Sequence, residues 1–238
     1  DGLDLADFRG RVGPAEATML DAATVGAGTR AAATESVCGG VTSALDMYFF
    51  PDAGLAAGAE VGLRVLSGPV VLDDEGIHSL GPDALVDDPE SWLAEHPPVA
   101  GWRPVVSPHS VYTVARERLV HAGQLAAAHD AVLHLHAAET LAEVQGCVDS
   151  YGRRPVELLD ELGLLGPRTV LAHGVHLTDA EIDRLAATGT SVAHCPASNL
   201  KLASGVARVP DLLAAGVHVA IGPDGAASSS DLEMLMAL

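Results

Sequence analysis

Short apolar runs alternate with helix-forming segments along most of this chain, and polar residues stand where several of the runs end. Three such runs are Ala131–Ala137, Thr169–Ala172 and Val217–Ile221, which are rich in valine, leucine and isoleucine. Strands that alternate with helices are typical of βα units around a parallel sheet. A (β/α) barrel collects polar residues at the carboxyl ends of its strands. The pattern therefore predicts an α/β fold, a TIM-type (β/α)8 barrel.

The same pattern predicts the individual strands and helices. Seven strands are expected, at Thr42–Tyr48, Arg64–Val71, Arg103–Ser107, Ala131–Ala137, Thr169–Ala172, Ser191–His194 and Val217–Ile221. Helices fall between them, and the longest are expected at Pro14–Val37, Val114–Asp130 and Glu139–Tyr151. The polar segment Asp73–Glu95 is predicted to be a long surface loop over the barrel mouth.

Local signals mark the ends of several helices. Thr178-x-x-Glu181 and Ser230-x-x-Glu233 have the spacing of capping boxes, in which two side chains bond the first free backbone N–H groups of a helix. Gly189 and Gly216 stand where a helix C-terminus favours a left-handed residue.

The length of 238 residues suits one barrel domain, and residues 1–238 are interpreted as a single, partial domain. Seven strands are one fewer than a closed barrel requires, and the chain stops within an apolar helix pattern. We therefore expect a fragment that lacks the first strand and the C-terminal part. We also expect the chain by itself to be inactive.

Composition excludes several kinds of partner. Thirteen Lys and Arg against 32 Asp and Glu give a net charge of −19, which argues against nucleic-acid backbones. No apolar run reaches the ~18 residues that a membrane span needs, so no membrane partner is expected. Three widely spaced cysteines support neither a disulfide framework nor a CxxC metal site, which favours a reducing cytoplasm.

Four residues are candidates for chemistry, namely His136, Glu139, His173 and Asp224. Histidine and aspartate suit a catalytic divalent metal, and a nearby glutamate outside the ligand set suits proton transfer for a metal-activated water. Simpler interpretations are a core histidine beside a helix-start glutamate, and a turn aspartate in Pro223-Asp224-Gly225. The recurrence of candidates at the spacing of βα units favours a shared site.

Other histidines leave alternatives open. His134 and His136 share one strand face, so His-Leu-His could itself supply two metal ligands. This reading ranks second because a barrel strand usually offers only its last inward residue to the mouth. His176 could pair with His173 on a metal, but the helix is predicted to start only at Thr178, so a loop hydrogen bond is favoured.

Two further strand ends carry polar residues, His109 and Asn199, which are candidate substrate contacts. Several motifs are absent from the sequence: the P-loop, Gly-x-Ser-x-Gly, His-Glu-x-x-His and Gly-x-Gly-x-x-Gly. Cys195-Pro196 has the wrong order for the Pro-Cys-x-x-Cys of small zinc deaminases and lacks the second cysteine.

Three segments together resemble the amidohydrolase superfamily, in the branch of 5-methylthioadenosine/S-adenosylhomocysteine deaminases and triazine chlorohydrolases. They are Leu135–Thr140, Ala172–Leu177, and the run from Ala193–Leu202 through Asp224–Ser228, with Asp46–Tyr48 and Pro108–Ser110 in support. The likeness covers nearly the whole chain.

The resemblance implies one divalent metal, zinc or alternatively iron, with four protein ligands. His136 and Asp224 match the third and fourth ligands, Glu139 the proton shuttle, His173 the residue that holds the attacking water, and His109 a substrate contact. The first two ligands belong to a first-strand His-x-His, and no histidine precedes Thr42. Pro223 stands where the family usually has threonine.

The catalytic set implied is Glu139, His173 and Asp224, and the substrate-binding set is His109, Glu139, His173 and Asn199. The implied activity is hydrolysis of a non-peptide C–N bond in a cyclic amidine. In it, an activated water attacks the amino-bearing ring carbon of an adenosine-type compound or a related aminated heterocycle.

Alternatives are a chlorohydrolase or guanine-type deaminase of the same superfamily, a non-catalytic barrel that binds a heterocycle, and an inactive fragment. The expected partners are a small heterocyclic substrate and, for the full-length protein, further copies of itself.

Overall fold

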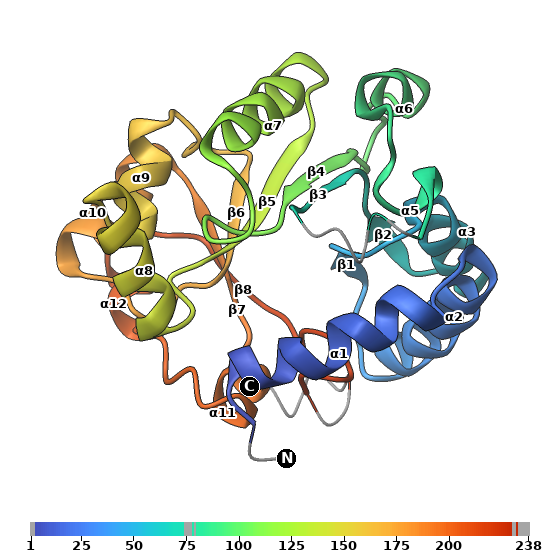
Figure 1. Ribbon diagram of the computed structural model, residues 1–238, viewed down its shortest axis with the longest axis horizontal. Helices are drawn as coiled ribbons and strands as arrows, with labels where there is room; N and C mark the ends of the chain where they lie inside the picture. The colour runs from blue at the N-terminus through green and yellow to red at the C-terminus, as the bar shows by residue number, and fades with distance from the viewer. Residues whose placement is uncertain (1–2, 74–77, 79, 230–231, 233–238) are drawn as a thin grey trace.

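The structure is a computed structural model that describes residues 3–73, 78, 80–229 and 232. Helices surround a ring of strands (Figure 1). The strands are β1 Ser43–Leu45, β2 Arg64–Leu66, β3 Val70–Val71, β4 Val105–Pro108, β5 Val132–Ala137, β6 Thr169–His173, β7 Ser191–His194 and β8 Val219–Ile221. The helices are α1 Leu5–Met19, α2 Ala22–Cys38, α3 Pro51–Val61, α5 Pro82–Leu85, α6 Pro89–Glu95, α7 Arg116–Ala128, α8 Leu141–Tyr151, α9 Pro155–Glu161, α10 Asp179–Thr188, α11 Pro196–Lys201 and α12 Val209–Ala214.

Every neighbouring pair of strands is parallel and follows chain order. β1 pairs with β2, and β3 to β8 form one continuous sheet. This order, with helices on the outside, confirms the (β/α) barrel class. Within the described residues, β1 pairs only with β2 and β8 only with β7, so these strands form an incomplete barrel.

The predicted strand Arg64–Val71 is divided into β2 and β3 in the structure. Pro69 lies between them and has no N–H to donate to a ladder. Its carbonyl still accepts from Ser107 N at 2.9 Å, and the carbonyl of Ser67 accepts from Val105 N at 3.1 Å. The segment therefore follows the strand path even where regular pairing stops.

The main core lies between the central strands and the helices outside them. Val106 in β4, Leu135 in β5 and Leu171 in β6 are almost completely buried, and Leu185 of α10 packs in the same cluster. The predicted strands for β4 to β8 lie within two residues of those observed, because continuous apolar runs are typical of strands buried on both faces.

The long helix predicted at Pro14–Val37 is wrong, because two helices occupy this region. α1 ends at Met19, and Asp21 caps α2 by accepting a 2.7 Å bond from Thr24 N. An aspartate at this position favours a helix start over continuation of the preceding helix. Figure 1 shows α1 crossing the front of the molecule from α11 towards α2.

The prediction that Asp73–Glu95 is only a surface loop is also wrong for its described part. The helices α5 and α6 occupy much of it. Trp92 and Leu93 of α6 are buried, and the Trp92 indole donates a 3.0 Å bond to Asp52. The apolar surface of these two residues anchors the segment to the barrel.

The predicted helix ends are confirmed where the structure describes them. Thr178 and Glu181 form a capping box, while Gly189 (φ 72°) and Gly216 (φ 85°) are left-handed. The predicted box Ser230-x-x-Glu233 lies outside the described residues. Of the helices described, none has both the length and the apolar character needed to cross a membrane.

Gly68, between β2 and β3, provides a test of this strand packing. A Cβ at Gly68 would lie 2.1 Å from the Val105 carbonyl oxygen, a backbone atom that cannot move aside. We expect Gly68→Ala to lower the free energy of unfolding by about 1–3 kcal/mol. Gly28→Ala is the control, because Gly28 is exposed within α2 with nothing nearby. That change should stabilise by about 0.4–1 kcal/mol. Denaturant unfolding measures both, and equal effects would contradict the packing.

Candidate active site

Five of the predicted site residues lie together at the carboxyl ends of strands β4, β5, β6 and β8. His109 follows β4, His136 lies in β5, His173 ends β6, and Asp224 comes after β8. With Glu139 they line one pocket of about 130 Å³. The other lining residues are Leu5, Phe8, Arg9, Tyr112, Leu202 and Ser228. The parallel register explains the convergence, because it pairs His136 with Ala172 and Ala137 with His173.

His136 is held in one tautomer by the backbone. Its Nδ1 lies 2.8 Å from the carbonyl oxygen of His109, and a carbonyl can only accept, so Nδ1 carries the proton. Burial, followed by the proximity of His173, lowers the pKa of His136. The neutral ring therefore keeps a lone pair on Nε2, which is the form that binds a metal.

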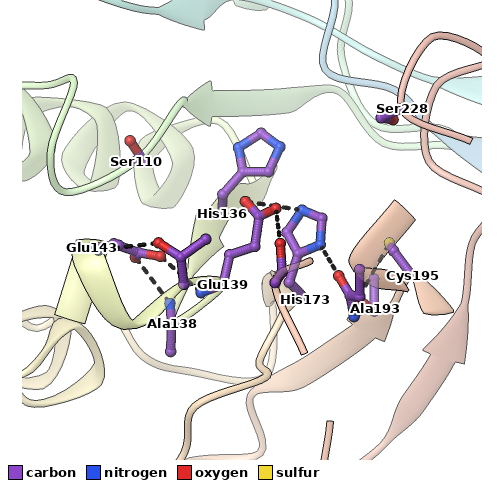
Figure 2. A network of polar contacts seen from close by, with 12 residues as sticks. Ser110, His136, Ala138, Glu139, Glu143, His173, Ala193, Cys195 and Ser228 are labelled. Atoms are coloured by element: carbon purple, nitrogen blue, oxygen red, sulfur yellow. Dashed lines mark hydrogen bonds and ion pairs between the residues drawn. The ribbon is translucent and has the colours of Figure 1, made fainter. Parts of the chain in front are cut away.

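Glu139 and His173 form a buried pair. His173 Nε2 lies 3.7 Å from Glu139 Oε2, and both residues are 2% exposed. His173 Nδ1 donates to Asn199 Oδ1 at 2.8 Å, and Ser204 Oγ donates to Glu139 Oε1 at 3.1 Å. Figure 2 shows the Glu139 carboxylate beside the His173 ring, with His136 next to them.

Burial moves both members of this pair towards their neutral forms. It raises the pKa of Glu139 and lowers the pKa of His173. Glu139 therefore holds a proton more readily than an exposed glutamate does, and the unprotonated Nε2 of His173 can accept one. Two adjacent groups shifted in this way are typical of sites that transfer protons.

Asp224 differs from Glu139 in its electrostatics. Burial of the carboxyl opposes ionisation, but His173 and neighbouring groups outweigh it, so the pKa of Asp224 lies below its usual value. Asp224 is therefore a carboxylate at neutral pH. It also has left-handed backbone (φ 63°), directly after Pro223.

The side chains at this pocket include the kinds of donor atom that bind a divalent cation. His136 Nε2 and the Asp224 carboxylate are the nitrogen and oxygen ligands that zinc accepts. In the part of the chain that the structure describes, no group of three or more His, Cys, Asp or Glu is arranged to hold a metal. A catalytic zinc takes three protein ligands and a water, so these two residues can form only part of a ligand set.

His134, the alternative ligand, points elsewhere. Its Nδ1 donates to the Val170 carbonyl at 3.0 Å, and its ring centroid is 6.5 Å from that of His136. Burial lowers the pKa of His134 to about 4, and the side chain is absent from the pocket lining. This neutral histidine serves the packing between β5 and β6.

Two other predicted residues have structural partners. His176 Nε2 donates to the Ser204 carbonyl at 2.7 Å, which confirms the predicted loop hydrogen bond. Asn199, a predicted substrate contact, lies in α11 behind His173 and does not line the pocket. Its observed contact therefore fixes the His173 ring.

The sequence did not predict that α1 forms one wall of the pocket. Leu5, Phe8 and Arg9 line the pocket, and the Arg9 guanidinium lies 5.2 Å above the Tyr112 ring. No motif in α1 signals this placement, although Asp4 as an N-cap marks the helix start. Ser204 was also missed, because a single loop serine carries no sequence signal.

A comparison with known protein families gives a match over nearly the whole chain. The sequence model described as "Amidohydrolase family" matches residues 3–238. The 5-methylthioadenosine/S-adenosylhomocysteine deaminase of Haloarcula marismortui is 44% identical over 227 residues, which is 94% of this chain and 52% of that protein. The corresponding deaminase of Thermodesulfovibrio yellowstonii is 38% identical, over 93% of this chain and 51% of its own length. The chain thus spans about half the length of the curated relatives it matches.

Solved structures of similar fold include a deaminase and a chlorohydrolase. A zinc-bound adenosine deaminase from Xanthomonas campestris superposes with a TM-score of 0.91 at 36% identity, covering 100% of this chain and 54% of that one. An atrazine chlorohydrolase from Arthrobacter aurescens, complexed with zinc, gives 0.86 at 25% identity, covering 98% and 57%.

The bond between Asn199 and His173 can be tested without an activity assay. Asn199→Ala leaves the buried Nδ1–H of His173 without an acceptor, so we expect a loss of about 1–3 kcal/mol in unfolding free energy. Leu200→Ala in the same helix is the control, since Leu200 is 66% exposed and should change stability by less than about 0.5 kcal/mol. Equal losses in denaturant unfolding would argue against the bond.

Proposed function

The chain belongs to the amidohydrolase family, and we propose that the complete protein is a hydrolytic deaminase of a small aminated heterocycle of the adenosine type. The supporting observation is the buried pair of Glu139 and His173, whose facing atoms lie 3.7 Å apart inside the pocket.

Amidohydrolases are metal-dependent, and we propose that His136 and Asp224 hold one zinc ion together with ligands from outside this chain. The support is that Nδ1 of His136 carries the ring proton, which leaves a lone pair on Nε2, and that the carboxyl of Asp224 is ionised. When bound, such a cation lowers the pKa of a water molecule towards ~7 and so supplies a nucleophile at neutral pH.

Residues of this chain then carry out the proton transfers. His173 is held by Asn199 with its unprotonated Nε2 towards the pocket, so it can orient a water and accept a proton from it. Glu139, held by Ser204, can deliver one proton to the ring nitrogen, then take a second proton from the hydroxyl group added to the ring carbon and give it to the departing ammonia. The proton that His173 accepted from the water can then return to Glu139, whose Oε2 lies 3.7 Å from His173 Nε2. His109 lies beside His136, with ring centroids 4.6 Å apart, where it can contact the heterocycle.

A substrate panel tests the proposed activity. Complete, zinc-loaded protein should release ammonia from adenosine-type compounds, and ammonia and chloride are measured over adenosine-type, guanine-type and chlorotriazine substrates. Chloride release without ammonia would instead support a chlorohydrolase, and preference for guanine would support a guanine-type deaminase. If none of these compounds is turned over by metal-loaded protein, the proposal is wrong.

A pair of variants separates metal binding from proton transfer. Glu139→Gln keeps the shape of the side chain but cannot shuttle a proton, so kcat should fall by ~10²-fold or more with the metal retained. Asp224→Ala should lose the metal, as measured by elemental analysis. Asp179→Ala is the control, because Asp179 is an exposed carboxylate on α10. Metal loss in Glu139→Gln, or full metal content in Asp224→Ala, would reverse the two roles.

A further inference from the structure

Two helices of the barrel begin with the same pattern, Thr-x-x-Glu, but use it differently. In α10 the Glu181 carboxylate accepts from Thr178 N at 2.8 Å and closes a capping box. In α8, Thr140 Oγ1 likewise accepts from Glu143 N at 3.1 Å. The Glu143 carboxylate, however, extends past the cap to two earlier residues.

Those residues form the turn that carries Glu139. Glu143 Oε1 accepts from Ala138 N at 2.9 Å, and Oε2 accepts from Glu139 N at 2.7 Å (Figure 2). Ala138 has a left-handed backbone (φ 54°), which is strained for a residue with a Cβ. Each oxygen of one carboxylate thus holds one N–H group of this turn.

The opposite side of the turn is held by the next βα unit. The Ala138 carbonyl accepts from Val175 N at 3.0 Å and from His176 N at 2.9 Å. The backbone leading to Glu139 is therefore bonded on both sides, and its side chain meets His173 and Ser204.

We propose that Glu143 is a positioning residue for Glu139, fixing the turn after β5 so that the Glu139 carboxyl faces His173. This inference rests on the proposed function, in which Glu139 transfers protons. A carboxylate suits the task because two N–H donors require two acceptors, and a glutamine offers one acceptor and one donor.

The partners of the buried Glu143 carboxylate distinguish it from a helix cap. The residue is 6% exposed, and burial raises the pKa of its carboxyl to about 7. Glu181, which closes a capping box, is also buried (2% exposed), so what distinguishes Glu143 is that its carboxylate accepts from two N–H groups that precede the helix. Glu143 does not line the pocket, so it acts on the reaction through Glu139 and the turn that carries it, and not by touching a substrate.

Glu143→Gln in the complete, zinc-loaded enzyme tests the proposal, with Glu181→Gln as the matched control. We expect kcat to fall by about 10–100-fold with KM and metal content little changed, because a small misplacement of a catalytic group has an effect of this size. Glu181→Gln disturbs a buried carboxylate at the same helix position and should leave kcat within about twofold. Equal falls in kcat for the two variants would overturn the proposal.

A double-mutant cycle shows whether the effect passes through Glu139. If it does, adding Glu143→Gln to Glu139→Gln should cost little further activity, since the proton carrier is already gone. An equal fold-loss in both backgrounds would mean that Glu143 has only a general structural role.

Backbone amide exchange tests the positioning without any assay of turnover. Glu143→Gln should accelerate exchange at Ala138 and Glu139, and Glu181→Gln should accelerate it at Thr178 instead. Unchanged exchange at Ala138 and Glu139 overturns the proposal even if the enzyme is active.

Failure of the wild-type enzyme on the substrate panel overturns the proposed function but leaves this measurement valid. Should Glu143→Gln not fold, Glu143→Asp, whose oxygens fall short of the turn, takes its place.

Discussion

Left-handed backbone at the ends of three strands shapes this site. Ala138 follows β5, His173 ends β6, and Asp224 comes after β8, with φ values of 54°, 72° and 63°. None is glycine, so each position costs of order 1–3 kcal/mol that the surrounding structure must offset. The sharp turns direct Glu139, His173 and Asp224 into one pocket instead of along the following helices. The parallel sheet offsets this cost for the turns after β5 and β6, because it brings them side by side and their backbones bond to each other.

The strands and their ends could be predicted because both depend on local pattern. Apolar β-type runs followed by His109, His136, His173 and Asp224 located one edge of the sheet, and the structure brings these residues around one pocket. The helix start at Asp21 was missed because the alanine-rich segments on either side are equally helical. α6 was missed because its anchor, the burial of Trp92 against the barrel, is a tertiary contact without periodicity.

The parts of the site that escaped prediction depend on contacts across long sequence distances. Arg9 meets Tyr112 only because α1 crosses the pocket, and Ser204 meets Glu139 only because the chain returns after β7. For Asn199 the position could be predicted but the hydrogen-bond partner could not. Its place near a strand end predicted a polar residue at the mouth, but not that its amide oxygen would bond to His173.

The hydrogen bonds between the turns after β5 and β6 also affect how this region can move. Gly174 N donates to the Ala137 carbonyl, and Val175 and His176 donate to Ala138, so the two turns share their backbone bonds. Neither can open locally without breaking bonds of the other, and both continue into paired strands of the sheet. The turns carrying Glu139 and His173 therefore belong to one cooperative unit with the central sheet. Thermal fluctuations that open surface loops leave their relative geometry intact, and it is lost only when this part of the barrel unfolds.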